Sequence, residues 1–439
     1  MPTPHVVIIG AGFGGLQAAR TLGRAGSDVR VTVVDRTNHF LFQPLLYQVA
    51  TASLSPGDIT VPVRYLLRKY RNTTVLMAAV TGIDPARRAV TLDDGRELAY
   101  DHLVLAAGAR HSYFGHDDWE RFAPGLKSIE DAIEIRRRFL LAFERAERTD
   151  DPTERAALQT FVVVGGGPTG CELAGVMPDI ARKALRRDFR NIDTTTTRVI
   201  LLEAAPRLLG TFPEKLGEHA RRDLEDLGVE VRTGAAVTRI DEGAVYLGDE
   251  RIATRSVFWG AGNAASPLAR DLGVPLDRAG RVLVEPDLSV AGRPELFVVG
   301  DLAATIEKDG SPVPGVAQGA IQGGRAAAQN ILRTIRGEPR RPFAYWDKGN
   351  LATIGRHKAV GDFKRFTVTG RIAWWLWLTI HVLYLAGFRN RVSVLVQWAW
   401  AYLTYQRGVR LITFAGRGTG VTAPAPPGSP AVLAPPGST

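Results

Sequence analysis

Cysteine is nearly absent from this chain, because Cys171 is the only one among its 439 residues. A single thiol excludes an intrachain disulfide framework, a redox centre made of two thiols and a cysteine-rich metal site. No other spacing of metal ligands is evident, so the sequence predicts no metal centre.

Acidic residues are outnumbered, with 45 Asp and Glu against 55 Lys and Arg, which gives a net charge of +10. A basic protein can bind nucleic acid or anionic lipid. No helix-turn-helix, zinc-finger spacing or stacking platform is present, so we expect no nucleic-acid partner. The N-terminal stretch "MPTPHVVIIGAGFGG" also lacks a basic leader, and we therefore expect the protein to stay on the cytoplasmic side.

The length allows two or three domains, and the 46 glycines are typical of α/β nucleotide-binding folds. Residues 416–439 consist mainly of Pro, Gly, Ser and Ala, with almost no charge and no aromatic side chain. Such a segment cannot bury a core, so we predict that it is disordered.

A first glycine loop follows the apolar run Val6 to Ile9, which is typical of a buried parallel strand. In "HVVIIGAGFGG", Gly10 makes the turn, Gly12 lets the backbone approach a pyrophosphate, and Gly15 lets helix and strand pack closely. Asp35 ends the next strand, where a carboxylate can bind a ribose 2′-hydroxyl. The pattern predicts a Rossmann dinucleotide site, to which we also assign Phe13, Gly14 and Arg36.

The same pattern recurs in "TFVVVGGGPTGCELAG", where Gly165, Gly167 and Gly170 take the three glycine positions. The strand in "TRVILLE" ends at Glu203, further from its glycines than the usual spacing of about twenty residues. A long helix from about Thr169 to Arg190 would account for this distance. An acid here favours NADH over NADPH, although Arg207 lies nearby. We also assign Pro168 and Thr169 to this second site.

Two dinucleotide sites in one chain resemble the two-dinucleotide-binding-domain flavoproteins, in which the first site holds FAD and the internal one NAD(P)H. "LVLAAGAR" resembles the exit of the FAD domain, with Ala107 and Gly108 at its turn, and "PELFVVGDLAA" resembles the returning strand. The resemblance places Gly300 and Asp301 at the ribityl and phosphate end of the flavin, whereas an ordinary helix N-cap is the alternative for Asp301. Gly262 is assigned to cofactor binding in the same way.

Three further stretches resemble type II NADH dehydrogenases, the single-subunit NADH:quinone oxidoreductases: "NHFLFQPLLYQVATASLSPGDI", "VAQGAIQGGRAA" and "HVLYLAGFRNR". The likeness covers residues 5 to about 412. It implies transfer of a hydride from NADH to FAD and then of two electrons to a membrane quinone, menaquinone or ubiquinone, without proton pumping. Sulfide:quinone oxidoreductase, which needs reactive cysteines, and a non-catalytic NADH-sensing flavoprotein are the alternatives.

The resemblance implies a quinone site on the helix that carries Gln318 and Gln322, which lie four apart and thus on one face. Their amides can bind a quinone carbonyl and its reduced hydroxyl, or instead cross-link neighbouring elements. Ala317 and other small residues favour close approach of a flat ring, and Pro314 is expected to start the helix. Glu172 is implied to contact nicotinamide or flavin and to relay protons, or else it stabilises the helix dipole.

Residues 373–405 are too apolar to face water, yet Arg389 and Arg391 interrupt them. We therefore expect a segment that lies on, or dips into, one leaflet of the membrane and does not span the bilayer. Ser393, Gln397 and Thr404 form one polar stripe on its second half, and the first half is expected to pack partly against a second copy, as in a homodimer. The segment contains five tryptophans and is flanked by three arginines, side chains that are typical of an anionic membrane surface: Trp374, Trp375, Trp377, Trp398, Trp400, Arg371, Arg407 and Arg410.

Together these observations predict an α/β fold of two Rossmann-like domains and a helical membrane-associating region. The FAD domain comprises residues 1–115 and 270–330, the NADH domain 116–269, and the membrane-associating region 331–415. We expect a peripheral protein on the cytoplasmic face of the cell membrane.

Overall fold

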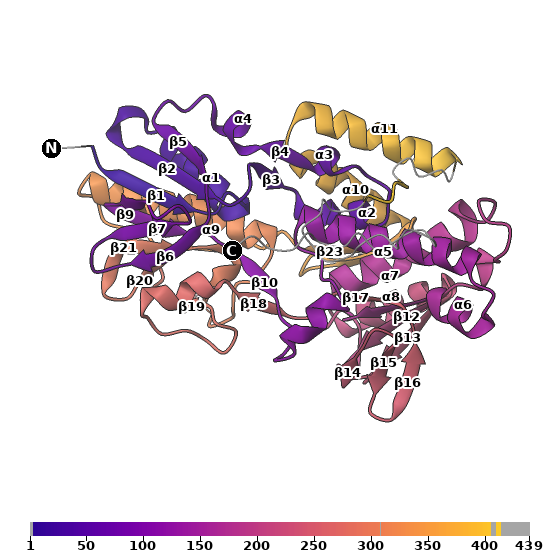
Figure 1. Cartoon of the computed structure of the whole chain (residues 1–439). Coiled ribbons are helices and arrows are strands. Elements are labelled where there is room, and N and C mark those ends of the chain that lie inside the picture. The colour runs from indigo at the N-terminus through magenta and orange to yellow at the C-terminus, as the bar shows by residue number, and fades with distance from the viewer. Residues whose placement is uncertain (1–2, 308, 405–409, 414–439) are drawn as a thin grey trace, which may run out of the picture.

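The computed structural model describes residues 3–307, 309–404 and 410–413. Figure 1 shows two α/β lobes side by side, with the last two helices lying along one edge of the molecule. The predicted tail 416–439 and Arg407 lie outside the described residues.

The first lobe is built on a six-stranded sheet in the order β20-β21-β9-β1-β2-β5, parallel except for β20. Its strands from the first part of the chain are β1 (His5–Ile9), β2 (Arg30–Asp35), β5 (Thr73–Met77) and β9 (His102–Leu105), and those from beyond the second lobe are β20 (Ser289–Val290) and β21 (Arg293–Val298). Helices α1 (Phe13–Gly23) and α9 (Ala317–Ile335) pack against each other so closely that a Cβ on Gly324 would lie 2.1 Å from the Gly14 carbonyl oxygen.

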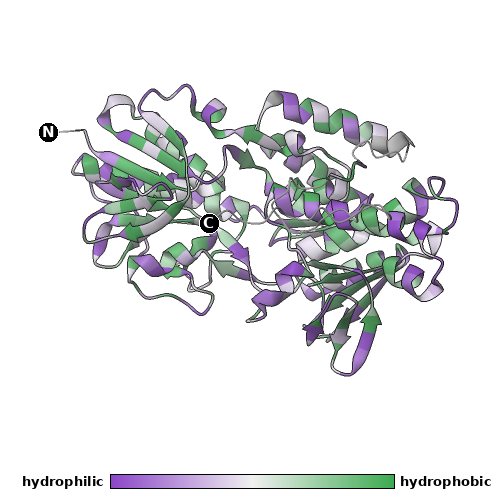
Figure 2. Cartoon of the chain, viewed as in Figure 1, coloured by the Kyte–Doolittle hydropathy of each residue, from purple (hydrophilic) through white to green (hydrophobic). Residues whose placement is uncertain are grey.

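The second lobe contains a parallel sheet in the order β13-β12-β11-β17. Its strands are β11 (Thr160–Val164), β12 (Arg198–Glu203), β13 (Val229–Thr233) and β17 (Ser256–Trp259), and its helices are α5 (Ile129–Arg148), α6 (Pro152–Leu158), α7 (Pro168–Asp179) and α8 (Glu214–Asp226). Figure 2 shows the hydrophobic residues gathered in the strands of both lobes, as expected for sheets covered on both faces.

Two chain segments connect the lobes and pair with each other. These are β10 (Ala109–His111) and β18 (Asn263–Ala265), which run antiparallel. The first sheet therefore takes strands from both sides of the inserted lobe.

The remaining elements complete the two lobes and the last part of the chain. The first lobe also has β3 (His39–Leu41), α2 (Leu46–Ala50), α3 (Pro56–Ile59), β4 (Thr60–Pro62), α4 (Val63–Leu67), β6 (Val80–Asp84), β7 (Ala89–Leu92), β8 (Glu97–Ala99), β19 (Val282–Leu283) and β22 (Ala303–Ala304). The second lobe has β14 (Arg239–Ile240), β15 (Ala244–Leu247) and β16 (Glu250–Ala253), and the last part of the chain has β23 (Asn350–Ile354), β24 (Lys358–Asp362), β25 (Thr367–Thr369), α10 (Gly370–Tyr384) and α11 (Phe388–Thr404).

Two helix boundaries differ from the sequence-based expectation. The helix expected to reach Arg190 ends earlier. Pro178 lacks an N–H donor, and just after it α7 passes into a π-helical turn, which ends at Ala184. Pro314 does not start α9, since its carbonyl accepts the Val316 amide in a tight turn before the first helical residue, Ala317.

The expected amphipathic tail folds as two helices. Arg391 explains the break, because its guanidinium donates to the carbonyls of Leu383 and Leu385 at the end of α10. Among the described residues, no helix combines the length and apolarity needed to cross a bilayer. Two residues of the expected polar stripe on α11 face inward: Ser393 and Gln397 both donate to Asp58 on α3, whereas the side chain of Thr404 lies outside the described part of the structure.

Candidate active site

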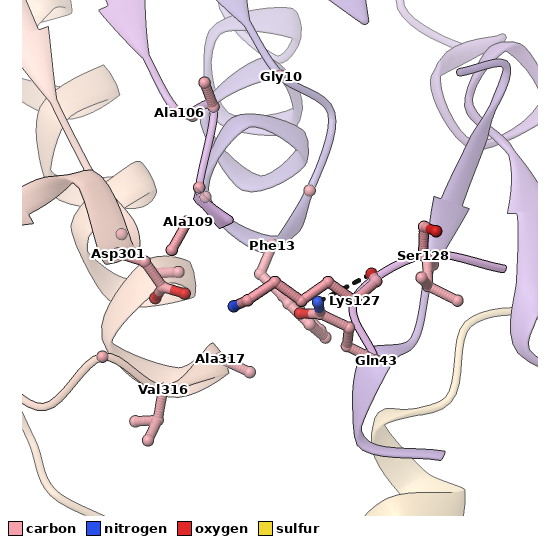
Figure 3. Close-up of a pocket in the computed structure, with 18 of the residues that line it drawn as sticks. Gly10, Phe13, Gln43, Ala106, Ala109, Lys127, Ser128, Asp301, Val316 and Ala317 are labelled. Atoms are coloured by element: carbon pink, nitrogen blue, oxygen red, sulfur yellow. Dashed lines mark hydrogen bonds between the residues drawn. The ribbon is translucent and has the colours of Figure 1, made fainter. Parts of the chain in front are cut away.

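A cavity of about 1240 Å³ lies where the two lobes and α10 meet. Its wall includes Gly12 of the first glycine loop, Glu172 on α7 and Tyr384 on α10. Figure 3 shows part of this wall, with Phe13, Asp301 and Ala317 around the open space. A single cavity thus joins the first glycine loop and the start of α7 to α10.

The first glycine loop has the geometry that the fingerprint requires. Gly10 has φ of +95°, and a Cβ on Gly15 would lie 1.8 Å from the Gly10 carbonyl oxygen, so neither position tolerates a side chain. A Cβ on Gly12, in contrast, would meet nothing within 4 Å, because this residue faces the cavity. The first turn of α1 carries no acidic residue, which leaves its positive end available to a phosphate.

Asp35 holds the loop in place. Its Oδ2 accepts the amide of Ala11 at 2.6 Å, and its Oδ1 accepts the amide of Thr37 at 2.7 Å. Asp35 and Arg36 line the cavity at the end of β2. Oδ1 also accepts the Thr37 hydroxyl at 2.8 Å, so Oδ2 is the oxygen with a further lone pair that can accept a hydroxyl of a ribose.

The second glycine loop repeats this geometry. Gly165 has φ of +106°, and a Cβ on Gly170 would lie 1.8 Å from the Gly165 carbonyl oxygen. Glu203 accepts the amides of Gly166 at 2.5 Å and Ala205 at 2.7 Å, as Asp35 does in the first loop. The two loops are therefore built in the same way in two different lobes.

Glu172, the fifth residue of α7, lines the cavity. Burial raises the pKa of Glu172 to about 8, while the backbone amide of Thr353 hydrogen-bonds the carboxylate and lowers it. The group is thus mainly protonated at neutral pH and can donate a proton.

The two glutamines of α9 have different surroundings. Gln318 lines the cavity, and its Oε1 is buried without a partner, whereas its Nε2 donates to the Gly349 carbonyl over 3.3 Å. Gln322 does not line the cavity, and both ends of its amide bind the backbone of Trp346 at 2.9 Å. Gln318 therefore has an oxygen available for a ligand, and Gln322 cross-links neighbouring elements.

Most of the residues assigned from the sequence line the cavity. Those that line the cavity are Gly10, Gly12, Phe13, Gly14, Asp35, Arg36, Ala107, Gly108, Pro168, Thr169, Glu172, Gly300, Asp301, Ala317 and Gln318, and those that do not are Gly15, Gly165, Gly167, Gly170, Glu203, Gly262 and Gln322. Gly262, with φ of +66°, packs against Phe114, since a Cβ there would lie 2.7 Å from the ring.

Four further side chains on the cavity wall were not identified from the sequence. Lys127 precedes α5, Lys348 donates to the phenol oxygen of Tyr384 at 2.9 Å, and His381 stacks on Trp377 with ring centroids 4.3 Å apart. Burial lowers the pKa of His381 to about 4. Because its Nδ1 lies 2.7 Å from the Trp377 carbonyl, which only accepts, the other ring nitrogen is an acceptor.

Two family models match the chain. Residues 4–324 match the pyridine nucleotide-disulphide oxidoreductase family, and residues 347–405 match the NDH2 C-terminal domain. The chain is 49% identical to the type II NADH:quinone oxidoreductase Ndh of Mycobacterium tuberculosis, over 94% of this chain and 91% of the relative. It is 31% identical to a probable NADH dehydrogenase of Dictyostelium discoideum, over 90% of this chain and 88% of the relative.

Solved structures share the fold. NDH2 from Plasmodium falciparum in complex with NADH superposes with a TM-score of 0.83 at 19% identity, covering 92% of this chain and 99% of that one. The sulfide:quinone oxidoreductase of Aquifex aeolicus gives a TM-score of 0.70 at 21% identity, covering 88% of this chain and 92% of that one.

Proposed function

Because the chain belongs to the type II NADH:quinone oxidoreductases, we propose that its central cavity holds FAD between a nicotinamide site and a quinone site. The enzyme oxidises NADH and reduces a quinone, and it uses FAD. The carrying observation is that one cavity is lined by the first glycine loop, by Glu172 and by Tyr384 of α10.

The residues present fit FAD. Gly12 leaves open space beside the N-terminus of α1, where a pyrophosphate can approach the helix. Asp35 can accept ribose hydroxyls, and Asp301 can do the same at the opposite wall. The small side chain of Ala317 at the start of α9 leaves room for a flat ring. When bound, FAD supplies the two-electron chemistry that connects nicotinamide to quinone.

The second glycine loop supports a separate site for NADH. We assign the pyrophosphate to Gly165, Gly167 and Gly170, with Pro168 and Thr169 at the helix start, and the adenosine ribose to Glu203. A carboxylate at this position repels a 2′-phosphate, so NADH is preferred over NADPH. Glu172 would then lie between the nicotinamide and the cavity, with a proton to donate.

Gln318 and Tyr384 are the proposed quinone contacts. The unpartnered Oε1 of Gln318 can accept the hydroxyl of the reduced quinol. Tyr384 accepts from Lys348, which leaves its own O–H free to donate to a quinone carbonyl. Gln322 is proposed to position this wall through Trp346 and not to touch the quinone.

Attachment to an anionic membrane surface is proposed for the outward face of α10 and α11. Apolar side chains there are exposed: Ile372, Trp375, Leu376, Leu383, Val392, Leu395, Val396 and Trp400. Their position beside the cavity would let a lipid-dissolved quinone reach Tyr384. We propose that part of this face also joins two copies as a homodimer, that it docks on the cytoplasmic face, and that turnover pumps no protons.

Sulfide oxidation is disfavoured by the surroundings of the single thiol. Cys171 is fully buried, does not line the cavity, and donates to the Gly166 carbonyl. Burial also raises the pKa of Cys171 far above its usual value, which suppresses the reactive thiolate.

Stopped-flow mixing of the purified holoenzyme with NADH and then with a soluble quinone tests the function. We expect the flavin absorbance to bleach with NADH and to return rapidly with quinone. A flavin that bleaches but is not reoxidised by quinone would indicate an NADH sensor instead.

A further inference from the structure

Lys127 places a half-buried amino group on the wall of the cofactor cavity. Burial lowers the pKa of Lys127, and the negative charges of Asp301 and Asp131 act in the opposite direction. Among the described residues, no carboxylate forms an ion pair with this amino group. Burying a cation without a close counter-charge costs folding free energy, and a negatively charged ligand in the cavity would offset that cost.

The backbone of Lys127 is fixed on both sides. Its amide donates to Asp131 Oδ2 at 2.9 Å, and its carbonyl accepts from Gln43 Nε2 at 3.1 Å. Asp131 is itself held, because it closes the capping box of α5 with Ser128 and lies 3.2 Å from the ring of His111. These bonds set the point from which the side chain extends.

The side chain crosses into the open space. Figure 3 shows its amino group pointing between Asp301 and Ala317, next to Phe13. Ala317 is the first residue of α9, whose N-terminus carries a partial positive charge. Two positive features thus face the part of the cavity between the Asp301 wall and α9.

Hydride transfer from NADH adds one negative charge to bound FAD, since NADH leaves as NAD⁺ and the hydride brings both electrons with its proton. A fixed positive charge in a partly desolvated cavity stabilises that charge more than it stabilises the oxidised cofactor. We infer that Lys127 is the residue that presents this positive charge to bound FAD and thereby raises its reduction potential. The inference rests on the proposed function, because it needs FAD in this cavity.

A contact with the FAD pyrophosphate is the other use of such a lysine. That contact would strengthen binding of the oxidised and reduced cofactor equally, because the phosphate charge does not change on reduction. The potential depends only on the difference between the two states, so it distinguishes the two roles.

The test compares Lys127→Met, which removes the charge, with Lys127→Arg, which keeps it. Lys215→Met, on the exposed surface of α8, is the matched control. For each holoenzyme we would measure the flavin-to-protein ratio and the midpoint potential by equilibration with a reference dye.

We expect Lys127→Met to keep its FAD and to lose about tenfold in its preference for reduced over oxidised FAD, which lowers the potential by about 30 mV. Lys127→Arg should restore most of this shift, and Lys215→Met should show none.

An unchanged potential in Lys127→Met would overturn the inference. Loss of FAD from Lys127→Met but not from Lys127→Arg would also overturn it, since the charge would then serve binding in both states. Loss of FAD from both variants would assign Lys127 to packing, again against the inference. Failure of NADH to reduce the wild-type flavin would instead contradict the proposed function, whatever the potentials.

Discussion

The hydroxyl of Ser393 on α11 donates to Asp58 Oδ1 of α3 at 2.8 Å, and this bond fixes which face of the helix meets the protein. Gln397, one turn later, donates to the other oxygen at 3.0 Å. Asp58 also accepts the backbone amide of Ser55. Ser393 and Gln397 therefore attach α11 to the first lobe, and the exposed apolar residues Val392, Leu395 and Val396 lie on its outward side.

Asp58→Ala should loosen α11. It leaves the Ser393 hydroxyl, the Gln397 amide and the Ser55 amide without their acceptor, which we expect to cost about 1–3 kcal/mol of unfolding free energy. Denaturant unfolding of the holoenzyme measures the loss, and hydrogen exchange should increase in α11. Asp249→Ala, at an exposed position, is the control. Unchanged exchange in α11 would contradict the anchoring role.

Gln318→Ala should slow reoxidation of the flavin by quinone and leave its reduction by NADH nearly intact, because it removes an unpartnered amide oxygen from a residue that lines the cavity. A tenfold or larger loss in the quinone half-reaction is expected from a lost hydrogen bond of about 1.4 kcal/mol. Stopped-flow measurement separates the two steps. Equal losses in both half-reactions would refute the assignment.

Gln322→Ala should act differently, because its amide binds only the backbone of Trp346. We expect a lower melting temperature, with the half-reactions changed together or not at all. A selective defect in the quinone step, with normal stability, would show that Gln322 contacts the quinone after all.

Glu172 should make the stability of the protein depend on pH. Its folded-state pKa of about 8 lies above the usual value of 4.5, so the native state binds more protons than the unfolded chain between these values. Stability is then fully present below pH 4.5 and falls as pH rises through 8. Glu172→Gln should remove this component of the decline. Parallel stability-versus-pH curves for the two proteins would show that the carboxyl is not buried in its neutral form.

Negative charges placed on the outward face of α10 and α11 should release the enzyme from lipid. Trp375→Glu with Val396→Glu alters two residues that are 61% and 62% exposed, one on each helix. Flotation with anionic vesicles should show loss of binding while NADH still bleaches the flavin. Met77→Glu, equally exposed on β5, should still float. Truncation before Ala373 is a poorer test, since it also removes Trp377 from the core and Tyr384 from the cavity.

Sequence reasoning worked best where the physical requirement is local in the chain. Gly10 and Gly165 must turn the chain at positive φ, and a Cβ on Gly15 or Gly170 would clash with the carbonyl oxygen of that first glycine of its own loop. Asp35, at the end of its strand, binds the loop that precedes it. Such relations are encoded in short spacing, and a chain pattern can predict them.

The roles of Gln318 and Gln322 could not be separated in this way. The two residues share a helical face, and only the path of the distant segment around Trp346 and Gly349 decides which amide is occupied. Lys127 gave no signal beyond its place before the capping box of Ser128 and Asp131. Its position in the cavity depends on Asp301 and α9, which lie far away in the chain.

The sequence by itself determined that two dinucleotide loops, an acid after each and an apolar, interrupted tail belong to one chain, because each of these is a matter of neighbouring residues. The tertiary structure alone decided that the first loop, the start of α7 and α10 border one cavity and that Ser393 and Gln397 of α11 face Asp58 instead of water. Hydrogen bonds and burial between distant segments determine this arrangement. Their energies depend on which groups come together in the folded chain, and the spacing of neighbouring residues does not contain that information.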